Sequence, residues 1–196
     1  MITGRSWFSD MSRFSPAVLE QLDDAQRPLA EQILKVSSIG LRGPYNPLLR
    51  SPVLGQRMLD LLHYLRWNTS LPLHLNEFAI LIIARLWRSQ VEWFAHAPIA
   101  IKAGLRSELI ADLKANRRPA GMQEDEAAVY DLVTELHGTH KLSDETFARA
   151  KRVLGEQQVV DLTAVSGTYV TIAMLLAMAD ESVPAGKPLP FQPTDP

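Results

Sequence analysis

The sequence contains no cysteine in its 196 residues. This absence excludes disulfide bonds, thiolate nucleophiles, cysteine-ligated zinc and iron–sulfur clusters, because each of them needs the sulfur of that side chain. It also gives no indication of an oxidising compartment. Thiol-based chemistry of every kind is therefore beyond this chain.

The chain also lacks an excess of charge and a long hydrophobic run. Its 20 basic and 22 acidic residues give a net charge of −2, which offers no surface-wide attraction for nucleic acid or an anionic membrane. The longest apolar run, Phe78–Ala84, is much shorter than the roughly 20 residues that span a bilayer. Residues 1–13 lack the apolar centre of a signal peptide. We therefore expect a cytoplasmic protein with neither nucleic acid nor membrane as a partner.

The sequence has no pattern typical of strands, and it has several signals that begin or end helices. Ser15-Pro16 and Ser51-Pro52 each place a capping serine before a proline, the arrangement typical of a helix start. Gly155 can end a helix that begins after Ser143. These signals predict an all-α fold.

The pattern predicts one helical domain over residues 15–182. Residues 1–14 are expected to be disordered or extended, and residues 1–10 could be an extension preceding a natural start at Met11. Residues 183–196 contain five prolines and are expected to form an extended tail.

Three helices are of particular interest. Apolar spacing predicts helices over 73–87 and 89–103, the second stopped by Gly104. A third, over 157–179, is apolar and rich in small residues. We expect it to be either the central, most buried helix or an oligomer interface.

The second of these helices carries an acid and an imidazole. Glu92 and His96 are four residues apart and thus project from one helix face. The carboxylate can hold one ring nitrogen and fix the tautomer, while the other nitrogen addresses a substrate. Glu77 and Arg85 interrupt the preceding apolar helix and need partners or a polar cavity.

Simpler interpretations of these residues remain open. Glu92 and His96 could be an ordinary surface pair, and Glu77 and Arg85 could be structural ion-pair residues. The Glu92–His96 spacing also suits two metal ligands, but no second acid–histidine set completes such a site. We therefore expect no metal.

At this window the sequence resembles the carboxymuconolactone decarboxylase family, which includes the alkylhydroperoxidase D-like proteins. The resemblance covers roughly residues 40–180 and is strongest from Asn76 to His96 and on through Ala97–Leu105. Gly43–Leu49 and Asn68–Pro72 also resemble connections in decarboxylase-like members. The resemblance implies an alkylhydroperoxidase D-like fold.

Peroxidase-type members of that family carry a Cys-x-x-Cys pair between the glutamate and the histidine of a proton relay. Counting from Glu77 at the family spacing puts Ser89 and Glu92 at the two cysteine positions and His96 at the histidine. Serine and carboxylate cannot cycle through a disulfide. Thiol peroxidase activity is therefore excluded.

Decarboxylase-type members resemble this chain better. They imply a cofactor-independent lyase that removes CO₂ from a small carboxylated lactone or a related aromatic ring-cleavage product. His96 would be the acid/base, oriented by Glu92, and Glu77 would take part in the relay. The candidate substrate-binding residues are Arg85 or Arg42 for a carboxylate, with Tyr45 and Asn46 reaching in from a loop.

The resemblance also implies a homotrimer or homohexamer. Rival hypotheses on the same scaffold are an isomerase, a hydratase or a dehalogenase using the same relay. A rival of another class is a non-catalytic, ligand-binding homo-oligomer.

Overall fold

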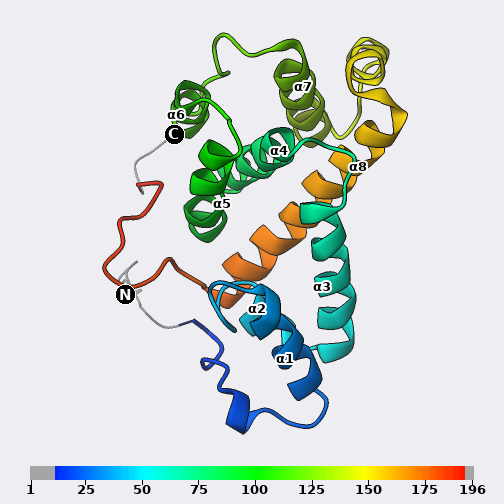
Figure 1. Cartoon of the computed structure of the whole chain (residues 1–196). Helices are drawn as coiled ribbons and strands as arrows, with labels where there is room; N and C mark the ends of the chain where they lie inside the picture. Colours follow the sequence, from blue (N-terminus) through cyan, green and yellow to red (C-terminus); the bar gives the residue numbers. More distant parts are fainter. Residues whose placement is uncertain (1–11, 193–196) are drawn as a thin grey trace, which may run out of the picture.

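The computed structural model describes residues 12–192, which form helices joined by turns, with no strand among those residues (Figure 1). The elements are η1 (Leu19–Gln21), α1 (Arg27–Val36), α2 (Tyr45–Leu48), α3 (Pro52–Trp67), α4 (Leu73–Leu86), α5 (Gln90–Lys102), α6 (Ser107–Lys114), α7 (Glu124–Thr139) and α8 (Asp144–Ala179). The prediction of an all-α fold is confirmed.

Helix α4 forms the centre of the larger hydrophobic core. Every residue from Leu75 to Arg85 is buried, because α5, α6, α7 and α8 pack around this helix (Figure 1). A helix that is apolar on all sides is expected to be enclosed in this way. The expectation that helix 157–179 is the most buried one is therefore wrong.

Helix α8 instead keeps one face open. Val160 and Met174 on that face are 67% and 53% exposed. The helix bends at Gly155, whose φ of 81° and ψ of 165° fit the stop predicted there. By length and composition α8 could cross a membrane, and half of its most apolar stretch is buried in the fold.

Helices α1, α2 and α3 form a smaller unit with its own core, in which Leu29, Ile33 and Leu49 are buried (Figure 1). Residues Tyr45–Leu48, predicted as loop, form the single-turn helix α2. This unit packs against α8.

One predicted helix start is right and another is wrong. Helix α3 begins at Pro52, directly after Ser51, as expected. No helix begins at Ser15-Pro16, and α1 starts only at Arg27. The segment is instead tied to the end of α8, where the Arg13 N–H donates to the Ala179 carbonyl at 2.7 Å.

The segment after α8 is non-helical over residues 183–192 but packs on the core. Phe191 is fully buried, with its ring centroid 5.0 Å from that of Trp93. The predicted extension at residues 1–10 and the tail residues 193–196 lie outside the described residues.

Candidate functional site

The centre of the candidate site is a hydrogen bond between two helices. Nδ1 of His96 on α5 lies 2.7 Å from Oε2 of Glu77 on α4. The chain reverses between these helices at Arg88, whose φ is 49°, and the Ser89 N–H then donates to the Ala84 carbonyl. This tight turn packs α5 along α4 and so brings together two residues that are 19 positions apart.

The pair is enclosed by protein. Glu77 is completely buried and His96 is 7% exposed. A buried carboxylate needs a donor, and the imidazole supplies one. Because Nδ1 faces Glu77, Nε2 is the ring nitrogen that does not take part in this hydrogen bond.

Glu92 is not the partner of His96, in contrast to the expectation from their spacing. Glu92 is also buried, but among residues 12–192 neither of its oxygens has a hydrogen bond of good geometry. Glu77 of the neighbouring helix contacts the imidazole instead, because α4 and α5 pack closely and the buried Glu77 carboxyl group cannot turn to solvent. The predicted orienting role passes from Glu92 to Glu77.

The environment of Glu92 favours its neutral form. Burial raises the pKa of Glu92 to about 8, and the hydroxyl of Ser89, one turn earlier, opposes part of that rise. At neutral pH Glu92 is therefore mainly a carboxylic acid, which can donate a proton. The site thus combines an imidazole held by one glutamate with a second glutamate that stays protonated.

Tyr169 of α8 covers the imidazole. Its ring meets that of His96 edge to face, with centroids 5.1 Å apart. Burial raises the pKa of the Tyr169 phenol, and the positive charge of Arg66 opposes part of that rise.

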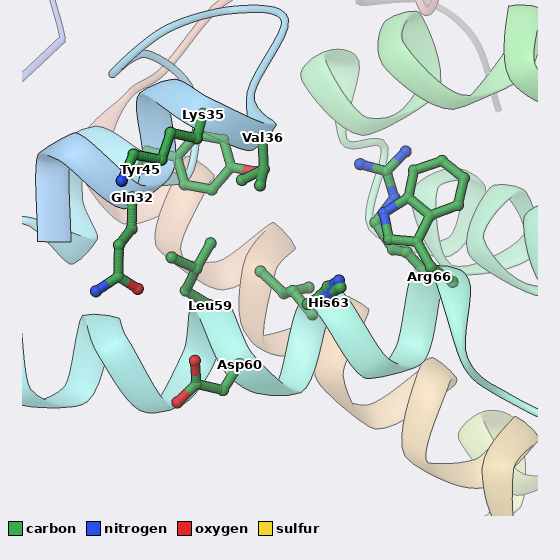
Figure 2. A pocket seen from close by; sticks show the side chains of 10 residues that line it. Gln32, Lys35, Val36, Tyr45, Leu59, Asp60, His63 and Arg66 are labelled. Carbon is green, nitrogen blue, oxygen red and sulfur yellow. The ribbon is translucent and has the colours of Figure 1, made fainter.

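A cavity of about 320 Å³ opens between α1 and α3 (Figure 2). Arg66 lies on one side of the hollow and Tyr45 on the other, with Leu59 and His63 along α3 between them. Burial raises the pKa of Tyr45, and the positive charge of Arg66 opposes the rise. Of the four predicted substrate-binding residues, Tyr45 alone lines this cavity.

The other three predicted binding residues lie elsewhere. Arg85 donates from Nε to the Lys114 carbonyl, and its guanidinium lies 5.3 Å from the centre of the Phe191 ring. The Asn46 amide donates to Glu181 and its oxygen accepts from Arg50. Arg42 is exposed. Arg85 and Asn46 thus join helices and connecting segments, and their predicted role in binding substrate gains no support.

Two residues of this region were missed by sequence reasoning. Tyr169 lies within a helix whose small residues drew the attention, and a buried tyrosine is usual in a core. Arg66 sits at the end of α3 beside Trp67, an ordinary place for a cation near a helix C-terminus. Arg66 becomes a candidate only because α1 packs across the cavity from it, and Tyr169 only because α8 brings its ring against His96.

Within residues 12–192 no three histidine, aspartate or glutamate side chains gather in a way that could hold a metal ion. Glu77, Glu92 and His96 thus share a site without forming such a group.

The comparisons with known proteins bear on the fold. No protein-family model matches the sequence, and no curated protein sequence matches it. Among solved structures, the chain is similar to the alkylhydroperoxidase AhpD core of an uncharacterized peroxidase-related protein from Ralstonia eutropha JMP134. The TM-score is 0.74 over 89% of this chain and 93% of that one, at 12% sequence identity.

The fold is alkylhydroperoxidase D-like. At this low identity the likeness shows the fold alone, and it does not extend to the carboxymuconolactone decarboxylase assignment. The peroxidase-related name belongs to that neighbour and is not carried over to this chain.

Proposed function

We propose that this protein is a cofactor-independent lyase that decarboxylates a small carboxylated lactone or a related aromatic ring-cleavage product. The observation that carries the proposal is the 2.7 Å hydrogen bond between the buried Glu77 and His96. Such a bond fixes the orientation and tautomer of an imidazole, which is what a general acid or base needs.

In the proposed reaction the bond between the ring carbon and the departing carboxylate breaks, and CO₂ leaves. The electron pair passes into the conjugated lactone as a dienolate. His96 delivers a proton to the ring carbon and is reprotonated from solvent, while Glu77 balances the charge of the imidazolium. The protonated Glu92 donates a hydrogen bond that stabilises negative charge as it develops.

The proposal is tested by offering a panel of lactone carboxylic acids to the wild type and its variants and by following CO₂ release. His96→Ala is expected to lower the rate by roughly 10²–10⁴-fold, the usual contribution of a positioned acid or base. Glu77→Gln should lower it as well, because an amide cannot balance the imidazolium charge.

His74→Ala is the matched control, since His74 lies on α4 in the first turn and only half-buried. Equal turnover by wild type and His96→Ala would dismiss His96 as the acid/base. An isomerase using the same relay would incorporate solvent deuterium into substrate without releasing CO₂. A non-catalytic binding protein would do neither.

A further inference from the structure

The cavity between α1 and α3 has a net positive lining. Lys35 and Arg66 contribute two cations, whereas Asp60 contributes one anion. The Asp60 carboxylate is already engaged, because it accepts a hydrogen bond from the Gln56 amide at 2.9 Å. The remaining charge favours an anionic ligand.

Arg66 offers a donor that nothing in the described part of the chain uses. Its Nε is buried and has no hydrogen-bond partner among residues 12–192. Its guanidinium lies 4.9 Å from the centre of the Trp67 ring, which limits the orientations that it can take. A buried donor on a planar guanidinium fits a carboxylate, which can accept two parallel hydrogen bonds from it.

The rest of the cavity fits a small ring. Leu59 and Leu62 are buried apolar residues of α3, and the Tyr45 ring faces Arg66 across the hollow (Figure 2). A volume of about 320 Å³ is near the lower end for ligand sites and suits a single ring rather than an extended molecule.

The cavity is also coupled to the acid–base pair. Tyr169 of α8 contacts the His96 ring edge to face, with centroids 5.1 Å apart. Arg66, which lines the cavity, opposes the rise in the pKa of the Tyr169 phenol that burial causes.

We infer that this cavity is a binding site for a small cyclic carboxylate, with Arg66 as the residue that binds the carboxylate group. The inference rests on the proposed function in taking this ligand to be the substrate. Arg66 is here a specificity-determining residue and His96 the catalytic one.

The test measures binding without turnover. Isothermal titration of the full chain with benzoate and with benzamide compares a carboxylate with a neutral group of the same shape. Benzoate is expected to bind the wild type with a Kd of about 1 mM or lower, and benzamide roughly tenfold more weakly or worse.

Arg66→Gln should weaken benzoate binding by roughly tenfold or more and leave benzamide binding unchanged. Arg66→Lys, which keeps the charge but not the planar fork, should lie between the two. Arg57→Gln is the matched control, because Arg57 is exposed on the same helix and does not line this cavity. Thermal melting of each variant checks that the fold is retained.

The outcomes separate this inference from the proposed function. The titrations measure binding and not CO₂ release, so a failure of the lyase hypothesis leaves the binding result standing. Equal affinity for benzoate and benzamide, no binding of benzoate to the wild type, or unchanged benzoate binding in a folded Arg66→Gln would each overturn the inference.

Discussion

Two buried glutamates of the same site behave differently at the scale of the single residue. Glu77 receives a hydrogen bond from His96, whereas Glu92 has no such partner among the described residues. The consequence for Glu92 is a pKa of about 8, caused mainly by burial. Because Glu77 holds His96 and Glu92 stays protonated, the site has both an oriented imidazole and a proton donor.

The raised pKa of Glu92 predicts a specific pH dependence of stability. The folded protein holds this proton up to pH of about 8, whereas the unfolded chain releases it near the ordinary value of 4.5. Between these values the folded state binds more protons, so the contribution of Glu92 to the free energy of unfolding falls by ~1.4 kcal/mol per pH unit.

Glu92→Gln, which is neutral at every pH, should remove that decline. Urea denaturation of the wild type and the variant across this pH range measures the difference, which is expected to grow in favour of the variant as pH rises. A constant difference would mean that Glu92 ionises normally in the folded protein. Glu108→Gln, exposed on α6, is the control.

The sequence predicted the members of this site better than their pairing. Glu77, Glu92 and His96 all lie at the buried junction of α4 and α5. Helical spacing could pair only Glu92 with His96, because it describes neighbours on one helix. The observed partner, Glu77, comes from a second helix, and its contact depends on how the turn at Arg88 sets α5 against α4.

At the scale of the element, Gly55 allows α3 to approach α1 and α2 closely. A Cβ added there would lie 2.8 Å from the Leu48 carbonyl oxygen and 2.5 Å from Cδ2 of Leu29. The leucine end can move, but the backbone oxygen belongs to the turn that joins α2 to α3. The glycine is therefore needed for packing rather than for its backbone angles.

Gly55→Ala is expected to destabilise the protein by about 1–3 kcal/mol through this overpacking. Gly138→Ala is the matched control, because no atom lies within 4 Å of the added Cβ and alanine favours a helix by up to about 1 kcal/mol. The midpoints of chemical denaturation measure both effects. A neutral Gly55→Ala would show that α3 moves away at little cost.

Helix ends were predictable where the local chemistry decides them. Pro52 at the start of α3 and Gly155 at the bend of α8 act through their own backbone angles. The signal at Ser15-Pro16 failed because Arg13 and Ser12 bond to the end of α8, far away in sequence. A capping pair cannot reveal such a long-range contact.

At the scale of the whole molecule, the segment after α8 packs against helices α4 and α5. Phe191 is fully buried between Trp93 of α5 and the Arg85 guanidinium of α4. Phe191→Ala should destabilise the protein by about 3–5 kcal/mol, the usual cost of removing a buried aromatic ring. Phe147→Ala, at a residue 46% exposed, should cost much less. Thermal denaturation measures both, and equal effects would contradict the packing role.

The open face of α8 bears on assembly. Val160, Gly167, Met174 and Met178 follow one another at helical spacing, and none of them carries a charge. Val160, Met174 and Met178 are exposed apolar side chains on this one helix face. We expect a homo-oligomer assembled through this face.

Gly167→Glu places a charge in the middle of that face, where a Cβ added to Gly167 would meet no neighbouring side chain or other helix within 4 Å. Sedimentation analysis should show a homotrimer or homohexamer for the wild type and a smaller species for the variant. Gly138→Glu, on the exposed part of α7, should leave the mass unchanged. A monomeric wild type would reject the expectation.

The tight reversal at Arg88 has a consequence for how this protein could diverge. Glu77 and His96 belong to one helical hairpin, whereas residues of α1–α3 line the cavity that contains Arg66. Substitutions in the first third of the chain can therefore change the lining of the cavity and leave the hydrogen bond between Glu77 and His96 in place. Under the proposed function, the choice of substrate can evolve separately from the acid–base pair.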